Sequence, residues 1–271
     1  MRVLGIMRGS RYSVNMAGLD AAILQAVVER LRRKGFTVDI IPESDMLSTG
    51  LERYDLVLSM ARDITALSQF RTTLPCLNTT EGILACSRKA LVAQVFQRAG
   101  IPQPAFSLGE SPKVRFPLWV KRGSGCSEEK SDTAYVSDEQ ELKAAIATLR
   151  ERGITECLLQ EHVEGDLVKF YGVEGTPFFH WLYADGTHSK FGLERLNGKH
   201  KGYAFSPLAL KAIADKAARQ LGVQIYGGDC IVDQRGQLNI IDFNDWPSFY
   251  CCQGKAAEAI VERTTNAMTK Q

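Results

Sequence analysis

The chain has 271 residues, of which 45% are apolar and 24% are charged, and its formal net charge is +2. This composition is that of a globular protein with room for one large domain or two small ones. The small net charge excludes the basic surface of a typical nucleic-acid binder, and no apolar run reaches the length of a membrane span, so we expect neither partner.

The first 80 residues alternate between strand and helix patterns. The apolar run MRVLGIM precedes a helical stripe at Leu19, Ile23, Val27 and Leu31, which ends at Gly35, and FTVDIIP and YDLVLSMA are two further strand candidates. Strands that alternate with helices in this way predict a small parallel sheet covered by helices.

The rest of the chain predicts an α+β arrangement with hairpins. The expected strands are FPLWVKRG, ECLLQEHV, LVKFYGV, PFFHWLY and the two strands of the hairpin GGDCIVDQRGQLNIIDFND. The expected helices are GILACSRKALVAQVFQRA as one helix before Gly100, a helix from a capping box at Ser137 to Gly153, a helix between Ser206 and Gly222, and KAAEAIVERTTNAM.

The hairpin carries the clearest chemical signal. If its strands pair symmetrically about Arg235-Gly236, Asp229 lies opposite Asp242, and Asn244 shares a face with Asp242 because side chains alternate along a strand. Three oxygen-bearing side chains would then converge, which suits a hard cation such as Mg²⁺. Asp245 faces the other way and is expected to be structural. The alternative, in which Asn244 and Asp245 only end the strand and Asp229 is solvated, stays open at this stage.

Lysines in apolar surroundings suggest a phosphate-bearing ligand. Lys121 ends a buried strand just before the glycine loop at 123–125, where backbone N–H groups can face anionic oxygens. Lys169 lies inside a strand and needs a counter-ion, whereas Lys89 lies on a helix, where a solvated position is the alternative. The chain contains neither a P-loop motif nor a dinucleotide-binding G-x-G-x-x-G after the first strand.

In combination, five segments over residues 80–250 resemble the ATP-grasp superfamily. They are, in order, SRKALVAQVFQRAGIPQP, PLWVKRG, LLQEHVEGD, VKFYGV and GGDCIVD…IIDFND. The resemblance implies an ATP-grasp fold of mixed α/β and α+β class. It divides the chain into a small N-terminal parallel-sheet domain (1–80) and an ATP-grasp domain (81–271), with a lid subdomain at about 104–162 and a C-terminal subdomain at about 163–271.

The resemblance also implies a role for individual residues, with ATP and one or two Mg²⁺ ions as cofactors. The implied contacts are Lys89 and Lys121 with the ATP phosphates; Gln160, Glu161, His162 and Val163 with adenine; Glu164 or Asp166 with ribose; Lys169 with the γ-phosphate; Arg195 with the transferred phosphate; and Asp229, Asp242 and Asn244 with Mg²⁺. For Arg195, an exposed ion pair is the alternative.

Two further segments are candidates for substrate recognition. Arg8, Ser10 and Arg11 follow the first strand and precede a helix N-terminus, which favours a carboxylate there. The segment WPSF, with Trp246, Ser248 and Phe249, directly follows the expected metal ligands. Ordinary loop residues are the alternative for the first segment, and burial in the core is the alternative for the aromatic residues of the second.

The function implied by the resemblance is an ATP-dependent carboxylate–amine or carboxylate–thiol ligase that acts through an acyl phosphate on small molecules. The alternatives are a small-molecule kinase of the same fold and a catalytically silent ATP-binding protein. Seven cysteines without a C-x-x-C pair favour a reducing cytoplasm, and a homodimer is compatible with the resemblance. Cys251 and Cys252 are expected in packing or a surface turn, and the histidines show no metal-ligand spacing.

Overall fold

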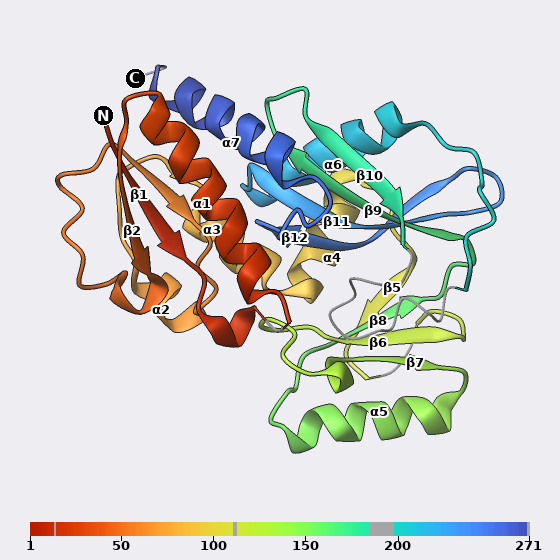
Figure 1. The fold of residues 1–271 in the computed structure, drawn as a ribbon. Helices are drawn as coiled ribbons and strands as arrows, with labels where there is room; N and C mark the ends of the chain where they lie inside the picture. The colour runs from red at the N-terminus through yellow and green to blue at the C-terminus, as the bar shows by residue number, and fades with distance from the viewer. Residues whose placement is uncertain (14, 111–112, 185–197, 270–271) are drawn as a thin grey trace.

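Three four-stranded sheets organise the chain, each with helices packed on it (Figure 1). The computed structural model describes residues 1–13, 15–110, 113–184 and 198–269. Among these residues no helix combines the length and the apolar character needed to cross a membrane.

The first sheet is parallel throughout, with the strand order β2-β1-β3-β4. Its strands are β1 (Arg2–Met7), β2 (Thr37–Pro42), β3 (Leu56–Ser59) and β4 (Cys76–Leu77), and its helices include α1 (Ala17–Arg33) and α2 (Ile64–Gln69). The predicted apolar stripe of α1 is buried, with Ile23, Val27 and Leu31 fully inaccessible to solvent. The predicted parallel sheet is therefore confirmed.

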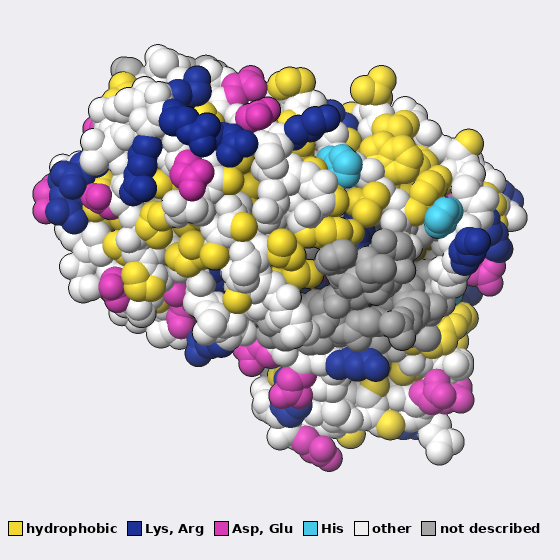
Figure 2. Space-filling view, in the orientation of Figure 1, with side chains coloured by type: hydrophobic (Ala, Val, Ile, Leu, Met, Phe, Trp, Pro, Cys, Tyr) yellow, Lys and Arg dark blue, Asp and Glu magenta, His cyan; other side chains and the backbone are white. Residues whose placement is uncertain are grey.

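The second sheet is antiparallel, with the order β5-β8-β6-β7. Its elements are β5 (Phe106–Leu108), β6 (Leu118–Arg122), β7 (Thr133–Val136), α5 (Glu139–Glu151) and β8 (Cys157–Glu161). Figure 2 shows this sheet and α5 as a lobe below the main body. The predicted capping box at Ser137 is wrong, because Asp138 is the N-cap residue and its side chain accepts hydrogen bonds from the amides of Gln140 and Glu141.

The third sheet is also antiparallel, with the order β10-β9-β11-β12. Its elements are β9 (Asp166–Val173), β10 (Phe179–Tyr183), α6 (Pro207–Leu221), β11 (Ile225–Val232) and β12 (Leu238–Asp245). The predicted limits of α6 are confirmed: Ser206 accepts the Ala209 amide, and Gly222 ends the helix in the left-handed conformation at φ 74°.

The prediction of one continuous helix before Gly100 is wrong, because the chain forms two helices there. The chain forms α3 (Thr80–Cys86) and α4 (Lys89–Ala99), and Arg88 between them has an extended backbone. Ser87 donates its hydroxyl to the Leu84 carbonyl, a local bond that competes with helix continuation. The break puts Lys89 at the first position of α4.

The C-terminal helix α7 (Gln253–Met268) returns to the first sheet and packs beside α1 (Figure 1). One hydrophobic core contains Ile23 and Leu58 of the N-terminal part, Ile225 of the third sheet and Ile260 of α7. The division at residue 80 stays a prediction, but its two parts share this core.

Gly82 in α3 provides a test of the packing between α3 and the end of α6. A Cβ atom there would lie 2.4 Å from the Gly222 carbonyl oxygen and 2.9 Å from that of Leu221. We expect Gly82→Ala to lower the free energy of unfolding by about 2–3 kcal/mol, because the backbone at Leu221 and Gly222 must move to admit the methyl group. Urea denaturation measures this change. The control is Gly254→Ala in α7, where a Cβ atom meets nothing within 4 Å. Equal stability of the two variants would contradict the expectation.

Candidate active site

A cavity of about 350 Å³ lies where the three sheets meet. Each sheet supplies polar side chains to its wall: Arg8 and Arg62 follow strands of the first sheet, Lys121 and Gln160 come from the second, and Asp229 and Asp242 come from the third. Charged groups from distant parts of the sequence therefore border one cavity.

The hairpin places its two acids as the sequence predicts. Asp229 pairs with Asp242 across β11 and β12, but the register shifts between Asp229 and Cys230, so that Cys230 pairs with Ile240. The symmetric register is therefore wrong on the turn side, and Ile241 is the extra residue of a β-bulge. Its carbonyl accepts the Lys121 ammonium at 2.8 Å. The bulge thus ties the third sheet to the second.

Lysines neutralise both hairpin acids. Lys169 lies directly opposite Asp229 in the register of β9 and β11, with 3.5 Å between Nζ and Oδ1. Lys89 forms an ion pair with Asp242, whose other oxygen accepts the Asn244 amide at 3.1 Å. Burial alone would raise the pKa of Asp242, but Lys89 and Lys121 outweigh it and hold the pKa below its usual range. The acid is therefore a carboxylate at neutral pH.

Lys121 joins the second sheet to the hairpin. Its ammonium donates to Gln160 Oε1 at 2.7 Å as well as to Ile241, and the residue is only 7% exposed. Burial and the neighbouring Lys89 lower its pKa to about 8, although Asp242 and Asp229 act in the opposite direction. The buried ammonium therefore carries an unfavourable desolvation free energy, which a bound anion would compensate.

The lowered pKa of Lys121 predicts a rise in stability from pH 8 to pH 10.5. In this window the unfolded chain binds a proton that the folded protein has released, so the free energy of unfolding increases with pH. The contribution approaches about 3 kcal/mol over the window. Urea denaturation at both ends of the window should show this rise in the wild type and lack it in Lys121→Met. Identical pH dependences of the two proteins would contradict the assignment.

The predicted adenine hinge lies at the end of β8 and borders the same cavity. Glu161, His162 and Val163 line the cavity together with Trp119, whose indole N–H donates to His162 Nδ1 at 3.1 Å. Burial lowers the pKa of His162, so the imidazole is neutral and carries its proton on Nε2. The Glu161 carboxylate already accepts the Arg115 amide at 2.8 Å.

The two acids predicted for ribose binding do not line this cavity. Glu164 is exposed, and Asp166 is buried and accepts the backbone amides of Lys201 and Tyr203 at 2.6 and 2.7 Å. The assignment of Asp166 to ribose stays a prediction; in this structure each of its carboxylate oxygens accepts one backbone amide and so holds the segment before α6. Arg195 lies outside the residues that the structure describes.

The loop after β1 is divided between the cavity and the surface. Arg8 lines the cavity, as predicted, and so does Ser13, whereas Ser10 and Arg11 are exposed outside it. Arg11 forms an ion pair with Asp63 at 2.9 Å on the surface. The assignment of Ser10 and Arg11 to substrate binding is therefore corrected, because the short 3₁₀ turn carries them away from the cavity.

The segment after β12 is divided in a similar way. Ser248 lines the cavity, but Trp246 and Phe249 are fully buried in the core. Both aromatic residues have a positive φ, 30° and 51°, and these turns direct their side chains inward. Trp246 is therefore a packing residue and not a substrate contact.

Arg62 is a cavity residue that the sequence reasoning missed. Its Nη2 contacts Asp245 twice. It lies 2.9 Å from the side-chain Oδ1 and 2.8 Å from the backbone carbonyl oxygen. Asp245 is buried away from the cavity lining, in agreement with its predicted structural role. Arg62 follows β3 as Arg8 follows the neighbouring parallel strand β1, and the carboxyl edge of such a sheet is where ligands bind. That positional signal could have identified it.

Arg8 and Arg62 form a buried pair of like charges. Burial and the nearby Arg62 lower the pKa of Arg8, while Asp245 more than offsets the effect of burial and raises the pKa of Arg62. Arg8 donates to Asp20, the Met60 carbonyl and the Trp246 carbonyl, whereas the buried Nε of Arg62 has no hydrogen-bond partner in the described protein. Arg62 is the better placed of the two to bind an anion.

Comparison with solved structures identifies the fold. D-alanine–D-alanine ligase from Bacillus anthracis in complex with ATP superposes with a TM-score of 0.69 at 14% identity, covering 100% of this chain and 99% of that one. A RimK domain ATP-grasp protein from Sphaerobacter thermophilus gives 0.67 at 14% identity, covering 97% and 98%. No protein-family model and no curated protein matches the sequence. The chain thus has the ATP-grasp fold, which confirms the predicted fold class.

Proposed function

We propose that this ATP-grasp chain is a Mg²⁺-dependent ligase that uses ATP to join a small-molecule carboxylate to an amine or a thiol through an acyl phosphate. One observation carries the proposal: a single cavity is bordered by lysines and acids suited to Mg²⁺–ATP and by two buried arginines suited to a carboxylate. A nucleotide site alone would not need the second group.

The nucleotide half of the proposal rests on the lysines and the hinge. Lys89 and Lys121 enter the cavity from α4 and β6, and Lys169 enters from β9, so that a polyphosphate between them would meet positive charge from several directions. The hinge Gln160–Val163 and Trp119 supply backbone groups and an apolar face for adenine. Gln160 acts indirectly, because its side-chain oxygen holds Lys121.

Asp229, Asp242 and Asn244 fit the ligand preferences of Mg²⁺. Their donor atoms are carboxylate and amide oxygens, and Mg²⁺ takes only a few of these from the protein. Lys89 and Lys169 balance the two carboxylates in the present structure, and both lysines would turn to the phosphates when a cation replaces them. Bound Mg²⁺ would neutralise charge on the phosphates during transfer.

The acceptor half of the proposal rests on Arg62. Its Nε has no hydrogen-bond partner among the described residues, and Arg8 places a second guanidinium beside it, although Asp245 and Asp20 each pair with one of the two arginines. A carboxylate bound by Arg62 would receive charge-assisted hydrogen bonds. Arg8 acts as a positioning residue because its own donors hold the chain after β1, β3 and β12. The second sheet borders the same cavity through Trp119, Lys121 and Gln160, and exclusion of water there would protect an acyl phosphate from hydrolysis.

The test is an incubation of the purified protein with ATP, Mg²⁺ and a pool of acids, amines and thiols, followed by mass spectrometry. A condensed product that accumulates with ADP and phosphate supports the ligase. A phosphorylated alcohol from an added pool of hydroxyl compounds would replace the proposal by a kinase. Tight ATP binding without turnover of any pool would replace it by a silent nucleotide-binding protein.

A further inference from the structure

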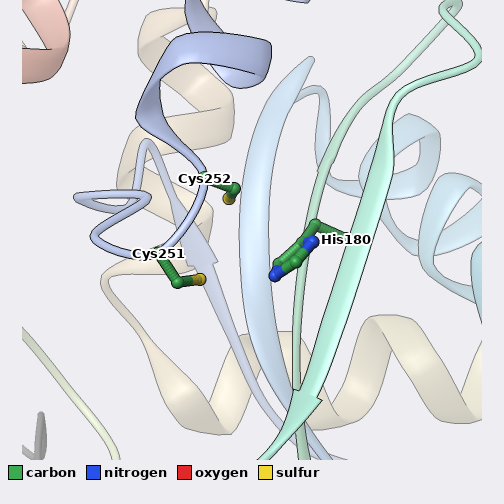
Figure 3. A group of neighbouring side chains, drawn as sticks. All are labelled: His180, Cys251 and Cys252. Carbon is green, nitrogen blue, oxygen red and sulfur yellow. The ribbon is translucent and has the colours of Figure 1, made fainter.

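Three side chains with a preference for soft metal ions meet on the side of the third sheet. They are His180, the second residue of β10, and Cys251 and Cys252 in the turn before α7 (Figure 3). One ligand atom from each lies within 4.8 Å of those of the other two. It is the one such group of three histidine, cysteine or acidic residues in the described part of the chain.

The spacing is close to that of a tetrahedral zinc site. With Zn–S near 2.3 Å and Zn–N near 2.0–2.1 Å, the ligand atoms of a tetrahedron are about 3.5–3.8 Å apart. Side-chain rotations that bring the ligand atoms about 1 Å closer to one another therefore suffice to coordinate an ion. Figure 3 shows the imidazole and both sulfur atoms directed toward a common space. Two thiolates and an imidazole select zinc over Mg²⁺, which prefers oxygen.

The backbone holds the three residues on two elements, His180 on β10 and the adjacent cysteines in the turn before α7. His180 pairs with Tyr171 in the ladder of β10 and β9. Cys252 donates its amide to the Phe249 carbonyl at 2.8 Å and accepts the Ala256 amide at 3.0 Å in the first turn of α7. The cysteines are free, Cys251 is exposed, and Cys252 and His180 are partly buried. An ion can therefore reach the group from solvent without unfolding.

We propose that His180, Cys251 and Cys252 bind one Zn²⁺ ion, with the fourth position left to a solvent ligand. The ion fastens the turn before α7 to β10. Tyr250, which precedes Cys251, lines the cavity, so the metal fixes one part of the cavity wall. The proposal is independent of the ligase proposal, because it concerns a separate group of side chains.

The experiment titrates the full chain, stripped with a chelator and kept reduced with a phosphine, with Zn²⁺ and with Co²⁺. We expect one equivalent to bind, with the thiolate-to-cobalt absorption of a tetrahedral site that Zn²⁺ abolishes, and a rise in Tm with zinc. Cys251→Ser, Cys252→Ser and His180→Asn should each weaken binding by at least about tenfold. Cys76→Ser, which changes a partly buried cysteine outside the group, should leave it unchanged.

Three outcomes would overturn the proposal. The first is a wild-type protein that binds no zinc under these conditions. The second is binding that His180→Asn leaves unaltered, which would remove the imidazole from the site. The third is zinc binding that persists in Cys252→Ser but disappears in Asp242→Asn, which would put the ion at the acidic hairpin. Circular dichroism and the Tm of each metal-free variant identify any variant that fails to fold, and the other two substitutions then decide.

Discussion

Asp242→Asn is expected to lower the rate of ATP consumption by about 10²–10³-fold or more, the scale of losing one electrostatic contact to a reacting group. The substitution removes the negative charge that faces Lys89 and the Asn244 amide in the cavity wall. It also replaces the proposed carboxylate ligand of Mg²⁺ by a neutral amide, which binds the cation more weakly. Calorimetry should show that the ATP affinity of the variant no longer depends on Mg²⁺. Turnover is measured as ADP release with the acid and the amine identified in the incubation with mixed acids and amines.

The matched control for this variant is Asp233→Asn in the turn of the same hairpin. Asp233 accepts the amides of Arg235 and Gln237 through Oδ1, and asparagine keeps an oxygen there. This control should retain Mg²⁺-dependent ATP binding. If Asp242→Asn binds Mg²⁺–ATP and turns it over as the control does, the metal assignment is wrong.

Arg8→Met is expected to lower the free energy of unfolding by about 3–5 kcal/mol, the typical cost of removing one partner from a buried ion pair. The Arg8 and Asp20 side chains are only 6% and 4% exposed and lie 3.1 Å apart. Without Arg8, the Ser13 hydroxyl is the one side-chain donor to Asp20 among the described residues, and the carbonyl groups of Met60 and Trp246 lose the bond that Arg8 donates. Urea denaturation at neutral pH measures the effect.

A double-mutant cycle separates the ion pair from the other contacts of Arg8. Arg8→Met combined with Asp20→Leu should cost less than the sum of the single changes, because the second change removes the uncompensated charge. The surface control is Arg33→Met, whose pair with Glu29 is 73% and 50% exposed; it should cost about 0.5 kcal/mol or less. A similar cost for Arg8→Met and Arg33→Met would refute the structural role of the buried pair.

The sequence predicts those features that depend on neighbouring residues. The parallel sheet, the ends of α6 and the pairing of Asp229 with Asp242 follow from strand alternation, caps and a short turn, and the structure has all of them. The β-bulge at Ile241 was not predictable in this way. It depends on Lys121, which lies 120 residues earlier and supplies the donor for the displaced carbonyl.

The same limit applies to the residues that were missed or misassigned. The position of Arg62 after a parallel strand could have identified it, but its ion pair with Asp245, 183 residues later in the chain, has no trace in a local pattern. Asp166, which the resemblance assigns to ribose as an alternative to Glu164, accepts the backbone amides of the distant residues Lys201 and Tyr203, and no local pattern indicates these bonds. The group of His180, Cys251 and Cys252 has no spacing signal for the same reason.

The return of α7 to α1 has a consequence for the synthesis of the chain. Helix α7 begins at Gln253, 176 residues after β4 ends at Leu77 (253 − 77 = 176). At about 5–20 residues per second, the ribosome makes this helix about 9–35 s after it has finished the first sheet. During that interval the apolar surface of α1 that α7 later covers faces solvent or a chaperone. The nascent chain is therefore prone to aggregation during this interval. The apolar surface of α1 is fully buried only after α7 has emerged from the ribosome.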